Sequence, residues 1–241
     1  MKGEEAVELG REFHLRKMQQ VRERLDEKGM DAIVLLNPLN IYYTTGFWYS
    51  IGVLERPVIL VLPRVGEPCL MVSLDLYGLR DAPVSTTVED VRVYSEYPYT
   101  SEGLPTLKWA CRHLHDAGLR GKRIGVEDNF IPINDGVCDP WVQQFVDYFD
   151  GEVVRAGKLV SEMRMIHEPE EIGLLRKACY YADMMVKTIS EQVNEGLLER
   201  EVAETARRIV EEQMRQDLSV IVPGLQSGRW LNYFCGTKGK R

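Results

Sequence analysis

Five cysteines are the residues of this chain whose side chains could serve as nucleophiles or as soft metal ligands. They are Cys69, Cys111, Cys138, Cys179 and Cys235. Their number is odd and no C-x-x-C pair occurs, which argues against a disulfide framework or a structural zinc site. Cys235 would need a neighbouring base to become a nucleophile, but no histidine flanks it. The thiols therefore indicate a reducing, cytoplasmic compartment, and we assign no residue to metal or cofactor binding.

Two histidines, His113 and His115, are spaced like a pair of metal ligands. The segment around them has a helical pattern, and residues two apart on a helix point in different directions. We therefore interpret both as surface residues. Four acidic residues show no spacing typical of a catalytic carboxylate pair, and we interpret them as parts of solvated loops. They are Asp75, Asp81, Glu89 and Asp90.

Apolar runs typical of strands alternate with helical patterns through the first 155 residues. Strands are predicted at 31–36, 57–62, 68–72, 88–94, 122–127 and 152–154, and helices at 4–28, 40–46, 102–115 and 140–149. Strands that alternate with helices predict an α/β domain with a largely buried sheet. We expect this domain to occupy residues 1–155.

After residue 158 the pattern becomes helical. Glu168-Pro-Glu-Glu171 has the features of a helix start, because proline fits the first turn and carboxylates there complement the helix dipole. One apolar stripe predicts the buried face of this helix; it consists of Ile172, Leu175, Cys179, Ala182, Val186, Ile189 and Val193. A second helix, at 199–215, leads to an apolar strand at 218–222 and a basic end. We expect residues 158–241 to begin a domain that this chain does not complete.

Composition narrows the class of function. The chain has 241 residues, 44% hydrophobic and 28% charged, with a formal net charge of −7. This balance is typical of a soluble globular protein, and the negative charge gives no support for binding a phosphate backbone. No apolar run approaches the roughly 20 residues of a membrane span, and the N-terminus lacks a signal-peptide core. We expect neither nucleic acid nor a membrane as a partner.

Four segments together carry a family resemblance. They are N-P-L-N-I-Y-Y-T-T-G-F at 37–47, R-I-G-V-E at 123–127, M-I-H-E-P-E-E-I at 165–172 and G-L-L-E-R-E-V-A at 196–203. In this order they resemble the creatinase / Xaa-Pro aminopeptidase / prolidase family of pita-bread hydrolases. The resemblance implies an N-terminal mixed-sheet α/β domain, followed by the helical opening of an incomplete α+β pita-bread domain. It also implies that the aromatic residues of 42–49 lie near the contact that caps the active site.

Intact relatives hydrolyse amide or related C–N bonds in small molecules, typically Xaa-Pro peptides or creatine. The resemblance implies a divalent metal pair (Mn, Co or Zn) in the metal-dependent members, held by two Asp, one His and two Glu. All five ligands follow a segment that resembles 226–241, so none is placed on this chain. Cys235 stands where the family has a histidine that contacts the substrate. A neutral thiol is a poor replacement for imidazole at pH 7.

We therefore expect a hydrolase-like chain without hydrolytic activity of its own, which would take a small peptide or small-molecule substrate only if the catalytic domain is completed. A homodimer is also expected. Two alternatives stay open: a non-catalytic binding or scaffold protein with a peptidase-like fold, and a gene product shortened by a stop codon, frameshift or cloning. The sequence identifies neither the substrate nor a separate chain that would complete the active site.

Overall fold

The computed structural model describes residues 9–48, 58–73, 86–94, 106–128, 139–194 and 196–214. Leu9–Ile166 form one compact unit, and the described residues from His167 onward belong to another. We call these the N-terminal unit and the second unit. None of the described helices is both long enough and apolar enough to cross a lipid bilayer.

A six-stranded mixed sheet forms the centre of the N-terminal unit, with the strand order β4-β3-β2-β1-β5-β6. The strands are β1 (Ala32–Leu35), β2 (Ile59–Pro63), β3 (Cys69–Ser73), β4 (Asp90–Tyr94), β5 (Arg123–Val126) and β6 (Glu152–Arg155). β2 runs antiparallel to both β1 and β3, whereas the pairs β1–β5, β5–β6 and β3–β4 are parallel. The predicted mixed-sheet α/β class is confirmed.

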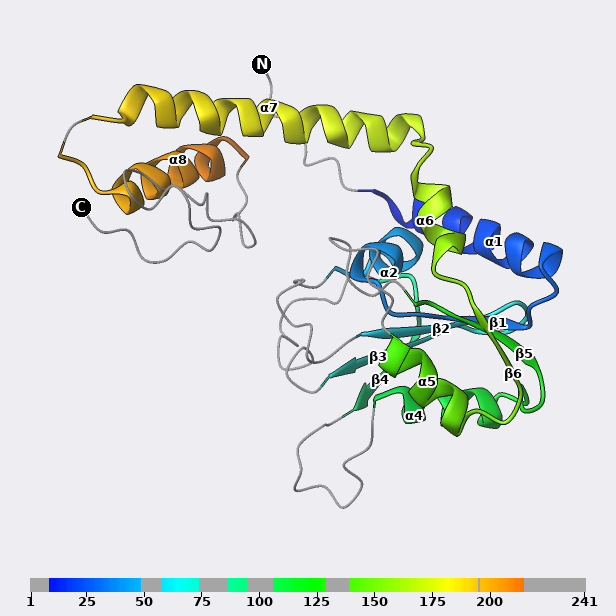
Figure 1. The fold of residues 1–241 in the computed structure, drawn as a ribbon. Helices are drawn as coiled ribbons and strands as arrows, with labels where there is room; N and C mark the ends of the chain where they lie inside the picture. The colour runs from blue at the N-terminus through cyan, green and yellow to red at the C-terminus, as the bar shows by residue number, and fades with distance from the viewer. Residues whose placement is uncertain are drawn as a thin grey trace. The chain divides into compact units, whose positions relative to one another are not determined.

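Helices cover both faces of this sheet (Figure 1). One face packs against α1 (Arg11–Glu27), α2 (Pro38–Thr45) and α6 (Lys158–Arg164), and the other against α4 (Thr106–Asp116) and α5 (Asp139–Tyr148). Successive residues of a strand point to opposite faces, so Ile33 joins the first core and Val34 the second. Because both faces are buried, the central strands β1 and β2 have the continuous apolar sequences that predicted them.

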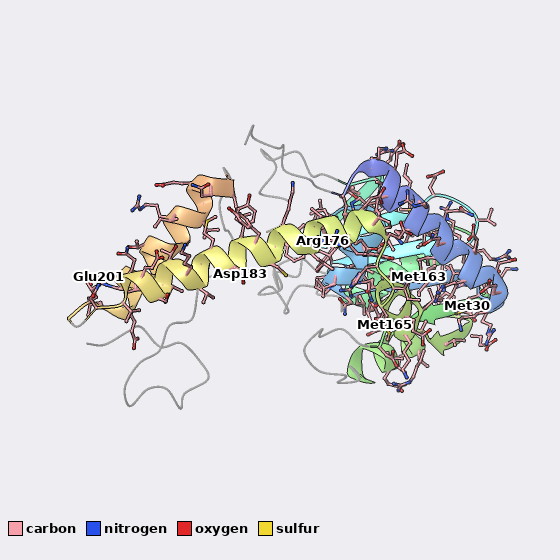
Figure 2. All side chains as sticks on the ribbon, turned by 90° about the horizontal axis from the view of Figure 1, so that it is seen from above. Met30, Met163, Met165, Arg176, Asp183 and Glu201 are labelled. Atoms are coloured by element: carbon pink, nitrogen blue, oxygen red, sulfur yellow. The ribbon has the colours of Figure 1, made fainter. Side chains whose placement is uncertain are left out.

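The second unit contains α7 (Pro169–Gln192) and α8 (Glu199–Met214), which pack against each other. Glu168 caps α7 as predicted, because its backbone N–H donates to Glu171 Oε2 at 2.9 Å in a capping box. Figure 2 shows Arg176 and Asp183 along this helix.

The apolar stripe predicted on α7 is not its buried face. Five of the stripe's seven residues are exposed and two, Ile172 and Ile189, are half-buried, whereas Thr188 is buried and Met184 is half-buried one turn earlier. α8 supplies a matching buried face of small and β-branched residues, namely Val202, Ala203, Ala206 and Val210. The helix itself was predicted correctly, but the most buried residues of α7 are not those of the predicted stripe.

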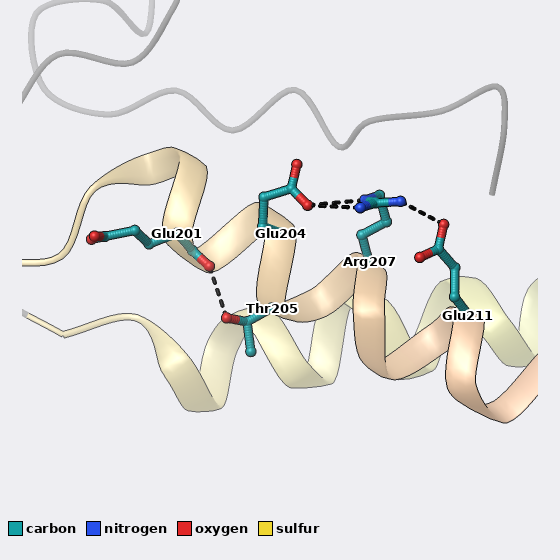
Figure 3. Close-up of polar contacts among 5 residues, drawn as sticks. All are labelled: Glu201, Glu204, Thr205, Arg207 and Glu211. Atoms are coloured by element: carbon teal, nitrogen blue, oxygen red, sulfur yellow. Dashed lines mark hydrogen bonds and ion pairs between the residues drawn. The ribbon is translucent and has the colours of Figure 1, made fainter. Parts of the chain in front are cut away.

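The exposed side of α8 carries a row of ion pairs along the helix (Figure 3). Arg207 donates to Glu204 Oε2 at 2.9 Å and to Glu211 Oε1 at 2.7 Å, so one guanidinium joins carboxylates three residues before it and four after it. Thr205 Oγ1 donates to the backbone oxygen of Glu201 at 2.8 Å. Such pairs contribute only a few tenths of a kcal/mol each, so they support the helix rather than forming a site.

Candidate functional site

A buried carboxylate lies where two of the family-like segments meet. Glu127 directly follows β5, and Leu36 and Asn37 directly follow β1, its parallel neighbour in the sheet. The carboxyl ends of parallel strands lie at the same edge of a sheet, so these residues come together there. Glu127 Oε2 accepts the backbone N–H groups of Leu36 at 2.6 Å and of Asn37 at 2.5 Å. This pairing joins the segment 37–47 to the segment 123–127.

Asn40 extends this contact to the last helix of the N-terminal unit. Its Nδ2 donates to Glu127 Oε1 at 2.5 Å and to Ser161 Oγ at 3.3 Å. Its Oδ1 accepts from Arg164 Nη1 at 3.0 Å. Ser161 and Arg164 both belong to α6, so the network ties β5, α2 and α6 together. We call Asn37, Asn40, Glu127, Ser161 and Arg164 the Glu127 network.

The Glu127 network positions helices and does not reach a substrate. Glu127 is only 1% exposed, so its carboxylate cannot take a proton from a molecule bound at the surface. Burial disfavours the charged carboxylate and raises the pKa of Glu127 to about 7. Hydrogen bonds from Asn37, Asn40 and Leu36 and the positive charge of Arg164 act in the opposite direction, but they do not outweigh burial. Asn37 also caps α2, since its Oδ1 accepts from Leu39 N at 3.0 Å.

An aromatic cluster on α1 and α2 forms the second part of the site. His14 lies beneath the end of α2, with its Nδ1 3.1 Å from the carbonyl oxygen of Tyr43. Burial lowers the pKa of His14, so the neutral ring can donate to this carbonyl. The ammonium of Lys17 lies 5.0 Å from the ring centres of both Phe13 and Tyr43, a cation–π arrangement.

One edge of this cluster reaches the surface. Tyr42 and Trp48 meet edge to face with ring centres 5.7 Å apart, and Trp48 is 44% exposed. Tyr43 and Phe47 are buried and belong to the core beneath α1 and α2. Tyr49 lies outside the described residues. Tyr42 and Trp48 are therefore the rings that a ligand or another polypeptide could contact.

Gly46 is needed for this arrangement, and its replacement gives a testable prediction. It ends α2 in the left-handed conformation with φ 76°, and an added Cβ would lie 3.0 Å from His14 Cδ2. Gly118 has nearly the same φ, 77°, with nothing within 4 Å of an added Cβ. We expect Gly118→Ala to cost about 1 kcal/mol of unfolding free energy from backbone strain alone. Gly46→Ala should cost about 1–3 kcal/mol more, because buried His14 must move.

Urea unfolding of the two variants measures this difference. Three of the four tryptophans, Trp48, Trp109 and Trp141, lie in the N-terminal unit, so tryptophan fluorescence reports its unfolding once Trp230 is changed to phenylalanine in the parent and in both variants. Equal losses of stability in the two variants would show that the contact between Gly46 and His14 does not constrain the end of α2.

A groove of about 500 Å³ lies beside α4 and α5. Its lining includes Lys108, Arg112 and Arg120, with Asp116 as the acidic member. Arg120 already pairs with Asp150 at 3.3 Å. The groove is therefore mainly basic, and His115 is its remaining titratable imidazole among the described lining residues.

Several residues singled out in the sequence differ from expectation or cannot be placed. His113 is buried, with 8% of its surface exposed, so its interpretation as a surface residue was wrong. His115 is half-buried and stacks on Phe149 at 5.4 Å. Asp90 begins strand β4 and is half-buried, so it is not part of a solvated loop. Asp75, Asp81 and Cys235, the expected substrate-contacting position, lie outside the described residues.

The described residues do not provide the ligands of the expected metal pair. Within them, the side chains that approach one another closely enough to share an ion are Cys69, Asp90 and His113. This is a different set from the two Asp, one His and two Glu that the resemblance implies. We therefore assign no step of metal-dependent hydrolysis to residues of the described region.

Comparison with known protein families identifies the family of the N-terminal unit. Residues 17–166 match the family described as the creatinase/prolidase N-terminal domain. The chain belongs to this family. The match spans nearly all of the N-terminal unit, including every member of the Glu127 network. The family resemblance carried by the sequence segments is thereby confirmed.

Two curated relatives are similar to most of the chain. A Xaa-Pro dipeptidase from Pyrococcus horikoshii is 24% identical over 189 residues, which cover 78% of this chain and 45% of that protein. A creatinase from a Bacillus species is 26% identical over 196 residues, covering 81% and 44%. The prolidase structure from Thermococcus sibiricus has a TM-score of 0.60 at 21% identity, covering 83% and 50%. The chain thus spans about half the length of these relatives, and the structural likeness shows the fold.

Proposed function

We propose that this domain serves a hydrolase that cleaves Xaa-Pro peptides or another small-molecule C–N bond, and that it forms the wall covering that enzyme's active site. The family match over residues 17–166 is the observation that carries the proposal. The names of the relatives, a Xaa-Pro dipeptidase and a creatinase, supply the class of substrate.

The geometry of the N-terminal unit supports a covering role rather than a chemical one. Glu127 is sealed from solvent, and its hydrogen bonds to Asn37 and Asn40 fix the start of α2. Asn40 in turn accepts from Arg164 and so holds α6. The rigid end of α2 in turn holds Tyr42 beside exposed Trp48. An exposed aromatic pair offers apolar surface at little cost in side-chain entropy, which suits contact with a proline ring or with another subunit. Formation of a homodimer and a cytoplasmic location stay predictions.

A divalent metal pair would supply an activated water and a clamp on the attacked carbonyl in this proposal. Cys235 would contact the substrate at the position where the family has histidine. The five expected ligands are not assigned to any residue of this chain, and the G-D-x-x-x-x-D-x-G segment is absent from its sequence.

The 241-residue polypeptide is accordingly expected to show no hydrolysis. The assay uses an Xaa-Pro dipeptide and creatine as substrates, with added manganese, cobalt or zinc. A positive control is the Pyrococcus horikoshii Xaa-Pro dipeptidase under the same conditions. Metal-dependent turnover by the 241 residues alone, removed by a chelator and restored by manganese, would overturn this expectation.

A non-catalytic binding protein is the second candidate, and one observation favours it. The apolar side chains of Leu175, Tyr180, Val186 and Val193 are exposed on α7. Such residues suit contact with another polypeptide. The two candidates differ in whether the complete gene product turns over substrate.

A further inference from the structure

Strand pairing places a thiol beside a carboxylate at the edge of the sheet. Cys69 begins β3 and Asp90 begins β4, and the two residues are direct partners in the parallel register. Partners in register point to the same face of a sheet. Cys69 belongs to the core beneath α4 and α5, so Asp90 also points toward that layer.

His113 comes to the same place from α4. The ligand atoms of Cys69, Asp90 and His113 all lie within 4.8 Å of one another. Cys69 is fully buried and His113 is 8% exposed, whereas the Asp90 side chain is 37% exposed. The cluster is therefore closed on the protein side and open to solvent along the Asp90 carboxylate, which gives an ion a route of entry.

His113 has a polar atom that the surrounding protein leaves unsatisfied. Its Nδ1 is buried and has no hydrogen-bond partner among the residues that the structure describes. Buried polar side-chain atoms are nearly always paired, and an exception calls for a physical reason such as an ion. Coordination of a cation by the imidazole would give the ring a polar partner.

We propose that Cys69, Asp90 and His113 form a zinc-binding site at the edge of the N-terminal unit. Thiolate, imidazole and carboxylate are the ligand types that zinc takes from proteins, and a water molecule would complete a tetrahedral set. An all-oxygen site would instead favour magnesium or calcium. The mixed set of one sulfur, one nitrogen and one oxygen fits zinc.

The distances allow this with small movements. Zinc bonds of about 2.0–2.3 Å in a tetrahedron separate neighbouring ligand atoms by about 3.3–3.8 Å. Closure from within 4.8 Å therefore needs shifts of about 1 Å or less. Binding forms a bond from the Cys69 sulfur to zinc and releases the thiol proton to solvent, with no change in oxidation state.

Without a metal ion, charged neighbours of the three residues interact with the Asp90 carboxylate. The Asp90 carboxylate lies within 4.8 Å of the Cys69 sulfur, and Arg92 donates to both Asp90 oxygens at 2.9–3.1 Å. Arg92 is half-exposed and can keep one carboxylate oxygen while the other binds the ion, which would orient the ligand. Asp116, one turn after His113 on α4, also acts on the charges of His113 and Arg92. Because the three ligands belong to β3, β4 and α4, a bound zinc ion would link these elements.

Cobalt(II) and zinc(II) titrations of the metal-free protein test the proposal. The experiment uses the full chain with Cys138, Cys179 and Cys235 changed to serine, which leaves Cys69 and Cys111 as the only thiols. We expect one cobalt per chain, with a thiolate-to-cobalt charge-transfer band that zinc removes. Zinc should also raise the melting temperature.

Matched variants assign the ligands. Cys69→Ala should abolish the charge-transfer band, whereas Cys111→Ala, at the other buried cysteine, should keep it. His113→Gln and Asp90→Asn should weaken cobalt binding by at least about 10-fold, whereas His115→Gln and Glu89→Gln should not. Circular dichroism of the metal-free variants checks that each of them is folded. No band in the parent protein, or equal binding by the ligand and control variants, would show a metal-free hydrogen-bonded cluster and overturn the proposal.

Discussion

Glu127→Ala is expected to lower the free energy of unfolding of the N-terminal unit by about 3 kcal/mol or more at pH 7. The change leaves the buried N–H groups of Leu36 and Asn37 without their acceptor and removes the partner of the Asn40 amide. Each unsatisfied buried donor costs about 1–3 kcal/mol, and a cavity adds to this. Since domains are stable by only about 5–15 kcal/mol, the loss is a large fraction of the total.

Glu152→Ala is the matched control for this change. Glu152 also belongs to the sheet and pairs with Arg123 at 2.9 Å, but its side chain is largely exposed. An exposed ion pair contributes about 0–1 kcal/mol, so this variant should unfold at nearly the parent urea concentration. Similar losses for the two glutamates would mean that the Glu127 network does not organise the domain.

The stability of the N-terminal unit should also depend on pH through Glu127. Its pKa is raised from the usual 4.5 to about 7 by burial, so between these values the native protein holds a proton that the unfolded chain has released. The free energy of unfolding must therefore fall as pH rises through this interval. The shift of the Glu127 pKa corresponds to a loss of roughly 3 kcal/mol of unfolding free energy across the interval. Below the pKa of the unfolded chain and above that of the native protein, Glu127 adds no further pH dependence.

Urea unfolding of Glu127→Gln between pH 4.5 and pH 8 isolates this effect. The variant cannot titrate at this position, so its stability relative to the parent should improve by roughly 3 kcal/mol across the interval. Glu152→Gln serves as the control and should follow the parent curve. The opposite slope would show that the N–H donors and Arg164 outweigh burial and keep Glu127 ionised.

Local patterns predicted most elements of the N-terminal unit because its helices and strands have strong periodicity or clear ends. The end of α2 at Gly46 followed from glycine's tolerance of a left-handed conformation. The hairpin of β2 and β3 followed from two apolar runs separated by a turn. The first helix begins at Arg11, so residues 9 and 10 of the predicted span are not helical, and residues 4–8 lie outside the described residues. The predicted domain limits, 1–155 and 158–241, stay predictions.

Contacts between distant residues could not be predicted in the same way. Glu127 and Asn37 are 90 residues apart, and only the parallel pairing of β1 and β5 brings them together. A glutamate and an asparagine that directly follow apolar strands were the available signal. His113 was misjudged because helical spacing shows the face of a residue but not what covers it. Asp90 and Cys69 approach it only through the register of β3 and β4.

The direct test of the central claim is the hydrolytic activity of the product of the complete coding frame that contains these 241 residues, compared with that of residues 1–241. We expect the complete product to carry the Gly-Asp ligand segment with later His and Glu ligands. With manganese or cobalt it should hydrolyse an Xaa-Pro dipeptide or creatine, whereas residues 1–241 should not. A complete product that lacks these ligands and turns over neither substrate would contradict the hydrolase proposal and favour a binding protein.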